Sequence, residues 1–312
     1  MILTRQRLAV VVIALTGALC GAAAAREEPP PGGVLPPARQ AQRVALLRRP
    51  GCREYEKVAE EFRSRAQAAV RLLSVVPGTK KTLHPWLVRF RPRLIVVVGQ
   101  TAYDELQGVK GLRAPIVHLL VFRDVVEQGD PINISSRIPP ARVLESLRLA
   151  RPGIRRVSIL HGPSSRAARE AAEAAALELD FELDVMEARS PAQAVRMLRR
   201  LSRKAEGLWL PVDLDILTPQ VLQYALGLQF RRRVVVAGAT RRHAEQGALL
   251  ALDYEPHSLG RRAASIANRY LAGHRDLQAA PGNIRLSVNR GTAQTLGIST
   301  GAFRAAGAEF VQ

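Results

Sequence analysis

Hydroxyl and carboxylate side chains follow several short apolar runs of this sequence, the place where binding residues gather in folds of alternating strands and helices. Asp213 and Asp215 come just after the run GLWLP, and Ser164 and Ser165 come after RVSIL. Backbone N–H groups at the start of a helix, with hydroxyls beside them, favour a bound carboxylate. A carboxylate such as Asp213 can neutralise an ammonium group. The pattern therefore predicts capture of a small charged molecule.

Further candidates follow the other apolar runs. Gly99, Gln100 and Thr101 come after LIVVV, where the start of the next helix is the best single site for an anion. The remaining candidates for contact with a ligand are Phe122, His161, Thr240, Asp253 and Tyr254. Simpler roles stay open, because Thr101 and Ser165 are also suited to cap their own helices and Tyr254 to pack as a hinge aromatic.

The sequence does not favour catalysis. Two neighbouring carboxylates without a third oxygen ligand or a nearby histidine are weak evidence for a metal or for acid–base work. The chain contains no Gly-x-Ser-x-Gly elbow, no P-loop, no Gly-x-Gly-x-x-Gly and no His-Glu-x-x-His, and its six histidines are dispersed. We therefore predict a protein that is not an enzyme, with no metal site and no cofactor.

The candidate residues are positioned by apolar runs that alternate with helical patterns. The run Leu94–Val98 is uninterrupted and aliphatic, as in a strand of a sheet covered on both faces. The polar segment GDPINISSRIPP, residues 129–140, breaks the alternation and predicts a first crossing between two lobes. Other predicted strands cover residues 43–47, 71–76, 115–121, 156–160, 181–188, 207–211, 234–238 and 248–252, and predicted helices cover 54–70, 83–90, 101–107, 142–150, 165–178, 191–203, 219–230 and 257–271. Strands separated by helices favour parallel sheets with right-handed crossovers.

A family resemblance is strongest in the last third of the chain. Residues 247–273 contain Gly-Ala-Leu, Leu-Asp-Tyr, Leu-Gly-Arg-Arg-Ala-Ala and a closing Leu-Ala-Gly, and residues 284–298 read IRLSVNRGTAQTLGI. Upstream, LIVVVGQTAYDEL is followed by APIV. These segments resemble the ABC-transporter substrate-binding proteins of the tryptophan/tyrosine-binding type, which have a type I periplasmic-binding-protein-like fold. The family also places a small hydroxyl residue in the loop of Thr101 and a tyrosine at the position of Tyr254.

The resemblance implies the domain organisation. The fold class is then α/β, with two doubly wound parallel-sheet lobes joined by a hinge and preceded by a signal peptide. Lobe 1 is expected over residues 42–136 and 254–278, and lobe 2 over residues 137–253 and 279–312. The predicted helix from His257 to Leu271 returns to the first lobe, and the last strand belongs to the second.

The first 25 residues have the order of a secretory signal peptide. Arg5 and Arg7 precede an apolar stretch, and small residues end near Ala25. The apolar stretch is too short for a stable transmembrane span, and Leu19 before Cys20 disfavours a lipid anchor there. Residues 26–41 form a proline-rich linker. We therefore predict a periplasmic or otherwise exported protein, in which Cys52 is the only cysteine after cleavage.

The formal net charge is +19, from 46 lysine and arginine residues against 27 aspartate and glutamate residues. Such a charge attracts anions, nucleic acid or anionic membranes. The basic residues are dispersed along the sequence, which is more typical of a solvated surface than of a binding stripe. With few aromatic residues to stack on bases, nucleic-acid binding is disfavoured, and such a function would require a steep salt dependence.

Together these observations predict an exported substrate-binding component of an ABC transporter. It would hold a small molecule, such as an amino acid, in the cleft between two lobes and present it to an inner-membrane permease that is driven by a separate ATPase. The alternative is an exported sensor or envelope interaction protein that keeps the same fold without a role in transport.

Overall fold

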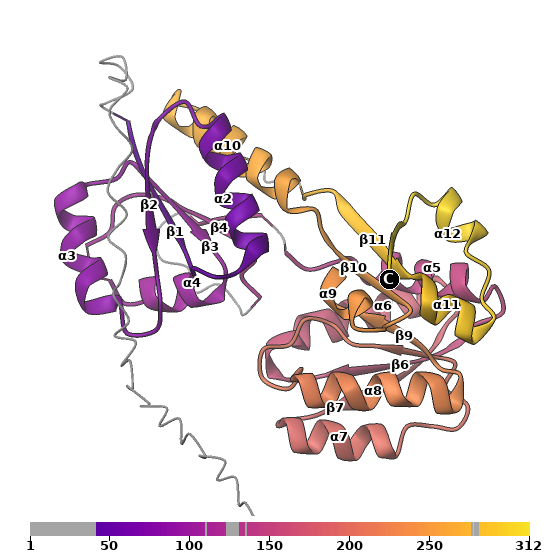
Figure 1. The fold of residues 1–312 in the computed structure, drawn as a ribbon. Coiled ribbons are helices and arrows are strands. Elements are labelled where there is room, and N and C mark those ends of the chain that lie inside the picture. The colour runs from indigo at the N-terminus through magenta and orange to yellow at the C-terminus, as the bar shows by residue number, and fades with distance from the viewer. Residues whose placement is uncertain (1–41, 110, 123–130, 135, 276, 278–280) are drawn as a thin grey trace, which may run out of the picture. The chain divides into compact units, whose positions relative to one another are not determined.

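The computed structural model describes residues 42–312 apart from residues 110, 123–130, 135, 276 and 278–280. The predicted signal peptide and most of the proline-rich linker therefore lie outside the described residues. The described chain contains two β-sheets with helices on both faces of each (Figure 1). The predicted α/β class with two lobes built on parallel sheets is confirmed.

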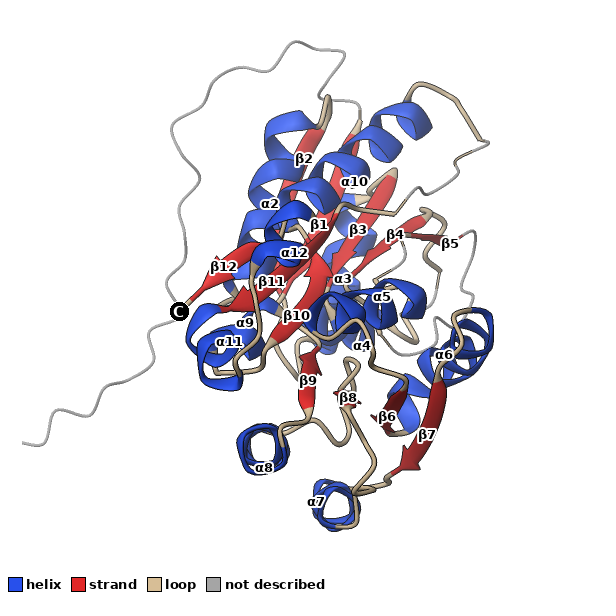
Figure 2. Ribbon diagram, turned by 90° about the vertical axis from the view of Figure 1, so that its right-hand side faces the viewer, coloured by secondary structure: helices blue, strands red, loops and turns tan. Residues whose placement is uncertain are grey.

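The first sheet has five parallel strands in the order β2-β1-β3-β4-β5. These strands are β1 (Arg43–Arg48), β2 (Ala69–Ser74), β3 (Leu94–Val98), β4 (Ile116–Leu119) and β5 (Pro131–Asn133). Figure 2 shows β1, β3 and β4 side by side. Every residue of β3 is buried, as expected of a central strand with apolar side chains on both faces.

Alternate residues of β1 pack against different helices, because successive side chains of a strand point to opposite faces of the sheet. Val44 and Leu46 belong to the apolar cluster that contains residues of α2 (Arg53–Arg65) and α10 (Pro256–Leu271). Ala45 and Leu47 belong to the cluster with α3 (Lys80–Phe90) and α4 (Gln100–Leu106). With both faces covered, the loops at the strand ends are left to form a binding surface.

Helix α10 joins the first sheet from a distant part of the sequence and packs along α2. Gly260 permits the close approach, since a Cβ atom there would lie 2.6 Å from the carbonyl oxygen of Val58. Asn268 holds the end of α2: its Oδ1 accepts a hydrogen bond from the Gln67 amide at 2.8 Å, and its Nδ2 donates to the Arg65 carbonyl at 3.0 Å.

The second sheet has seven strands in the order β12-β11-β10-β9-β8-β6-β7. They are β6 (Arg156–His161), β7 (Glu182–Glu187), β8 (Gly207–Trp209), β9 (Val235–Gly238), β10 (Leu250–Tyr254), β11 (Ile284–Asn289) and β12 (Glu309–Val311). Neighbouring strands are parallel except β10 and β11, which are antiparallel. The second sheet is therefore mixed at the side formed by the end of the chain.

Two groups of helices cover the second sheet. Residues of α5 (Pro140–Ala150), α6 (Arg166–Glu178), α11 (Arg290–Leu296) and α12 (Gly301–Ala305) pack in one cluster. Residues of α7 (Pro191–Arg199) and α8 (Pro219–Arg232) pack in the other. The side chain of Thr218 accepts a hydrogen bond from the Val221 amide and so caps the start of α8.

Three sequence predictions need correction. The helix expected over residues 54–70 ends at Arg65, and Ala69–Ser74 forms β2, because Asn268 takes the hydrogen bonds at the junction. Part of the expected crossing at residues 129–140 is β5, which pairs with β4. The segment between the predicted strands 234–238 and 248–252, for which no helix was predicted, contains the short helix α9 (Arg241–Glu245).

Candidate functional site

A pocket of about 270 Å³ is lined by residues that belong to both sheets. Most of the residues come from the segments that follow β1, β4, β5, β6, β8 and β9, and from the end of β10. All of these segments lie at the carboxyl ends of parallel strands, where open α/β sheets bind their ligands. The volume is close to the lower end of the range for small-molecule sites, which is about 300 Å³.

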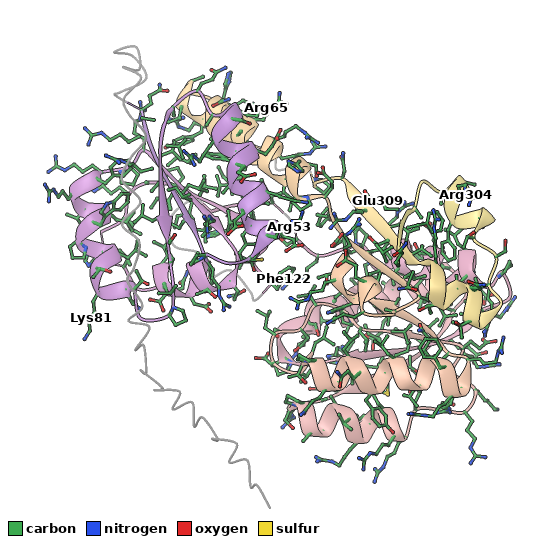
Figure 3. All side chains as sticks on the ribbon, viewed as in Figure 1. Arg53, Arg65, Lys81, Phe122, Arg304 and Glu309 are labelled. Atoms are coloured by element: carbon green, nitrogen blue, oxygen red, sulfur yellow. The ribbon has the colours of Figure 1, made fainter. Side chains whose placement is uncertain are left out.

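Four aromatic residues dominate the apolar part of the wall: Tyr55, Phe122, Trp209 and Tyr254. Trp209 and Tyr254 are almost fully buried, and the Tyr254 hydroxyl donates to the Arg137 carbonyl at 3.2 Å. Figure 3 labels Phe122, whose chain segment follows β4. Because ring faces bury a large apolar area with few rotatable bonds, this wall suits a flat apolar or aromatic ligand.

Tyr55 also covers the start of α4. A Cβ atom at Gly99 would lie 2.5 Å from the Tyr55 ring, so the two residues are in direct contact. Gln100 is nearly buried and accepts a hydrogen bond from the Phe122 amide at 3.1 Å. Gly99, Gln100 and Thr101 are not among the residues that line the pocket. The Tyr55 ring thus lies against Gly99, and the three residues that we expected to hold a ligand carboxylate are not part of this pocket wall.

Burial raises the pKa of Tyr55 to about 12, and the charges of the nearby Cys52 and Glu54 act in the same direction. The phenol is therefore neutral at physiological pH and can both donate and accept a hydrogen bond. Burial also raises the pKa of the Cys52 thiol, which keeps it protonated and weakly nucleophilic.

Asp213 organises the loop after β8 and does not line the pocket. It is 4% exposed. One of its oxygens accepts hydrogen bonds from the Gly162 amide at 2.8 Å and the Ser165 hydroxyl at 2.6 Å. The other accepts from the amides of Asp215 and Ile216. With four donors already bound, the carboxylate is not placed to neutralise a ligand's ammonium as we had expected.

The two predicted serines line the pocket, but their hydroxyl protons point elsewhere. Ser164 donates to Asp215 at 2.6 Å, and Ser165 donates to Asp213. His161 does not line the pocket; it is 1% exposed, and its Nδ1 lies 3.3 Å from the Gly162 carbonyl. The serine hydroxyls of this loop therefore donate to other protein groups and are not free to donate to a ligand.

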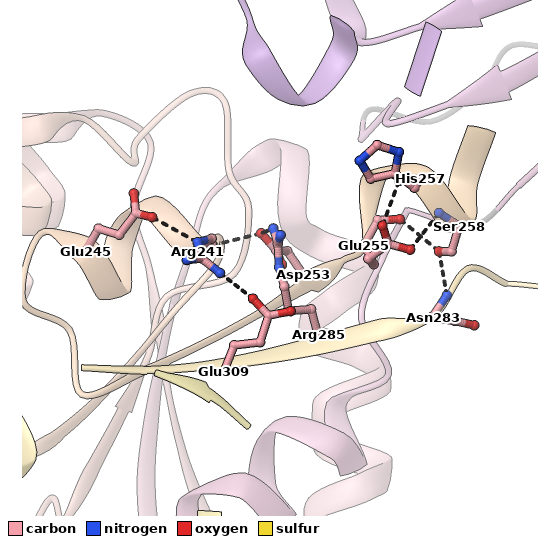
Figure 4. A network of polar contacts seen from close by, with 9 residues as sticks. All are labelled: Arg241, Glu245, Asp253, Glu255, His257, Ser258, Asn283, Arg285 and Glu309. Carbon is pink, nitrogen blue, oxygen red and sulfur yellow. Dashed lines mark hydrogen bonds and ion pairs between the residues drawn. The ribbon is translucent and has the colours of Figure 1, made fainter. Parts of the chain in front are cut away.

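Asp253 lines the pocket with its charge already paired. Arg285 binds it through two hydrogen bonds of 2.8 and 2.9 Å, and the Arg241 amide adds a third of 2.8 Å. Figure 4 shows this network, in which the Arg241 side chain also contacts Glu245 and Glu309. The bidentate pair neutralises the carboxylate that we had considered as a partner for an ammonium.

Three further groups at the wall, Arg242, Glu54 and Thr240, keep capacity for a ligand. Arg242 is exposed and forms no ion pair with the described residues. Glu54 is an exposed carboxylate in the first turn of α2. Thr240 precedes α9 without capping it through its side chain. Arg137 also lines the wall and donates to the Phe122 carbonyl.

The pocket thus contains six of the predicted residues, namely Phe122, Ser164, Ser165, Thr240, Asp253 and Tyr254. Sequence reasoning missed Tyr55, Glu54, Trp209, Arg137 and Arg242 as wall residues. Tyr55 and Glu54 could have been predicted as wall residues from the sequence, because they lie in the first helical turn after β1, at the carboxyl end of a strand. Trp209 lies within β8 itself, where the apolar run predicted only a buried strand.

No group of three or more histidine, cysteine, aspartate or glutamate side chains in the described part of the chain could hold a metal ion. None of the described helices has the length and apolar character that a membrane crossing requires.

No family model matches the sequence, and no curated protein matches it. Solved structures do match. An ABC domain in complex with L-tryptophan from Streptococcus pneumoniae has a TM-score of 0.64 at 15% identity and covers 87% of this chain and 99% of its own. A ligand-free, open substrate-binding protein with adhesive properties from Clostridium difficile has a TM-score of 0.70 at 14% identity, with the same coverage.

The fold is periplasmic-binding-protein-like. The same fold appears in a LacI family transcriptional regulator from Mycobacterium smegmatis, with a TM-score of 0.52 at 15% identity over 76% of this chain and 92% of that one. At such identities the likeness establishes the fold and not the ligand. The periplasmic-binding-protein-like fold therefore leaves the choice of function to the chemistry of the site.

Proposed function

We propose that this protein is an exported solute-binding protein that captures a small molecule in the aromatic pocket. The observation that carries the proposal is the pocket wall, which combines loops from both sheets with four aromatic side chains. A ligand that contacts both sheets binds one arrangement of the lobes more tightly than the others. This difference in affinity shifts the protein toward the arrangement that holds the ligand. The fold neighbours with bound or transported solutes support this role.

The chemistry of the wall supports a ligand with an aromatic or apolar body and a carboxylate. Arg242 offers an exposed guanidinium, which suits bidentate binding of a carboxylate. Glu54 is the carboxylate placed to meet an ammonium, in place of Asp213 and Asp253, which are engaged in hydrogen bonds. An aromatic amino acid is therefore our first candidate, and the bound L-tryptophan of the pneumococcal protein agrees with that choice.

The proposed partners are an inner-membrane permease and a separate ATPase. In this scheme the liganded form is what the permease recognises, and the chain itself supplies binding and not chemical energy. The signal-peptide pattern of residues 1–25 supports a periplasmic location.

The test is thermal unfolding of the purified protein against aromatic amino acids, their decarboxylated amines and their deaminated acids. A ligand that binds the folded state alone adds about 2.7 kcal/mol at a hundredfold excess over Kd, enough to raise Tm by a few degrees. We expect the amino acids to raise Tm more than either truncated series. Failure of every compound to raise Tm would count against solute capture.

Replacing Arg242 with alanine should weaken binding of the carboxylate ligand. Loss of a charge-assisted hydrogen bond costs about 1.5–3 kcal/mol, or roughly 10- to 100-fold in Kd. Calorimetric titration measures the change. Arg262→Ala is the matched control, since Arg262 is also exposed but lies outside the pocket. Equal affinity of Arg242→Ala and the parent for the ligand would show that the Arg242 guanidinium does not bind the carboxylate.

A sensor or envelope interaction protein is the second candidate, and the regulator among the fold neighbours is the observation that favours it. Such a protein would pass a ligand-dependent change to a signalling partner. Crosslinking in intact cells separates the two candidates, because recovery of a permease supports transport and recovery of a sensor kinase supports signalling.

A further inference from the structure

Positive charge gathers on helices α7 and α8 and on the turn that follows α7, although the sequence had suggested that the basic residues were dispersed. We define the α7/α8 face by six exposed cations: Arg196, Arg199, Arg200, Arg203, Lys204 and Arg231. None of the six forms an ion pair with the described residues. Helices α7 and α8 contain no aspartate or glutamate.

The cations of the two helices converge on one ring. The guanidinium carbon of Arg199 lies 6.0 Å from the centre of the Tyr224 ring, and that of Arg231 lies 5.8 Å from it. Gly227 leaves room for Arg231, since a Cβ atom there would lie 3.0 Å from one of its nitrogens. Figures 1 and 2 both show α7 and α8 side by side, and Figure 3 shows nitrogen-tipped side chains projecting from them.

The nearby acidic side chain at the end of this segment is already engaged. Glu206 accepts hydrogen bonds from the Arg155 and Arg156 amides at 3.0 and 2.9 Å, and it pairs with the Arg156 side chain. It therefore does little to offset the face. Six cations without counter-charges repel one another, so an anionic partner gains from each of them.

An exposed aromatic side chain lies on the same helix as Arg231. Phe230, the residue before Arg231 in the last turn of α8, is 45% exposed. A basic face with an exposed ring suits an anionic membrane surface, where cations meet lipid headgroups and rings enter the interface. A nucleic acid would instead select a basic groove with several stacking rings, and none of the six cations lines the pocket described above.

We propose that the α7/α8 face docks on an anionic phospholipid surface. The proposal is independent of the pocket and of its ligand, because the two share no residue. Docking by this face would hold the protein at a membrane and raise its local concentration there.

The test is co-sedimentation of the purified protein with vesicles of equal parts phosphatidylglycerol and phosphatidylcholine, and with pure phosphatidylcholine vesicles. We expect binding to the anionic vesicles only, with at least a tenfold loss of affinity between 0.05 and 0.3 M salt. Binding to both vesicle types alike, or to neither, would overturn the proposal.

Two variants with the same net charge test which face binds. The face variant carries Arg196→Gln, Arg199→Gln, Arg203→Gln and Lys204→Gln. The control carries Arg63→Gln, Arg71→Gln, Lys81→Gln and Arg89→Gln, four exposed cations on the first sheet and its helices. We expect at least a tenfold weaker affinity for the face variant and less than a threefold change for the control. Equal losses would overturn the assignment to α7 and α8.

Phe230→Ala distinguishes a lipid from a soluble polyanion. It should weaken vesicle binding about threefold or more and leave binding to heparin unchanged. Tight binding to heparin or duplex DNA together with no binding to anionic vesicles would overturn the choice of lipid.

Discussion

His118 is a titratable side chain buried in the first sheet. It is 2% exposed on β4, its ring meets the edge of the Tyr103 ring, and neither ring nitrogen has a hydrogen-bond partner among the described residues. Burial lowers its pKa to about 4. Burial and the charge of Arg242 lower the pKa of His243 to about 4 as well, and its Nδ1 accepts from the Ala239 amide.

These histidines should make the fold sensitive to acid. Between pH 6.5 and 4 the unfolded chain binds a proton at each histidine while the folded chain does not, so stability falls as the pH falls through that window. For one histidine the free energy of unfolding falls by about 1 kcal/mol between pH 6 and pH 5. Urea unfolding at both pH values measures this change.

The variant His118→Leu isolates one of these histidines. Its free energy of unfolding should fall by about 1 kcal/mol less than that of the parent over the same pH change. The reason is that leucine at position 118 binds no proton when the chain unfolds. Val88→Ala, at an exposed position of α3 without a titratable group, is the control and should follow the parent. Identical pH dependence in His118→Leu and the parent would contradict the account.

At the scale of elements, the contact between α2 and α10 ties the start of the described chain to its last third. Gly260 allows that contact, and the Asn268 side chain bonds Arg65, the last residue of α2, and Gln67 just after it. The interface also buries Phe62 and Ala263 in one apolar cluster. The end of α2 and its packing on the first sheet thus depend on α10, a helix from the last third of the chain.

Gly260→Ala should destabilise this helix pair. The added Cβ would lie 2.6 Å from the Val58 carbonyl oxygen and 2.8 Å from the Glu61 Cβ, so the helices must separate. Overpacking of this kind costs about 1–3 kcal/mol, measurable by urea unfolding. The exposed Ser265→Ala on the same helix is the control and should change stability by less than about 0.5 kcal/mol. A neutral Gly260→Ala would mean that α10 shifts freely.

At the scale of the whole molecule, the charge is the dominant property. The whole chain has a net charge of +19, and the six cations of the α7/α8 face form no ion pair with the described residues. Self-repulsion of this size works against the compact state. The same field attracts anionic solutes and surfaces, so it bears on the pocket ligand and on the proposed docking.

Added salt should therefore stabilise the fold. Raising sodium chloride from 0.05 to 0.3 M shortens the screening length and weakens the repulsion, so Tm should rise by a few degrees. Calorimetry measures the shift. The variant with four glutamines on the α7/α8 face should show a smaller rise than the parent. A Tm that falls with salt would mean that attractive ion pairs outweigh the repulsion.

The sequence by itself determined the alternation of strands and helices. Apolar runs such as Leu94–Val98 are buried on both faces of a sheet, and Thr218 caps α8, because these features depend on neighbours in the chain. Sequence reasoning also located the loops in which half of the pocket wall lies. It could not assign roles within those loops.

The tertiary structure decided those roles. Asp213 lies 51 residues from Gly162 and 48 from Ser165, yet their hydrogen bonds consume its charge. Tyr55 comes to lie against Gly99 from another strand, and Asn268 ends a helix from 203 residues away. A carboxylate, a ring or an amide keeps the same chemistry wherever it occurs in a sequence. Its partners are set by distances in space, so whether it is free for a ligand follows only from the folded chain.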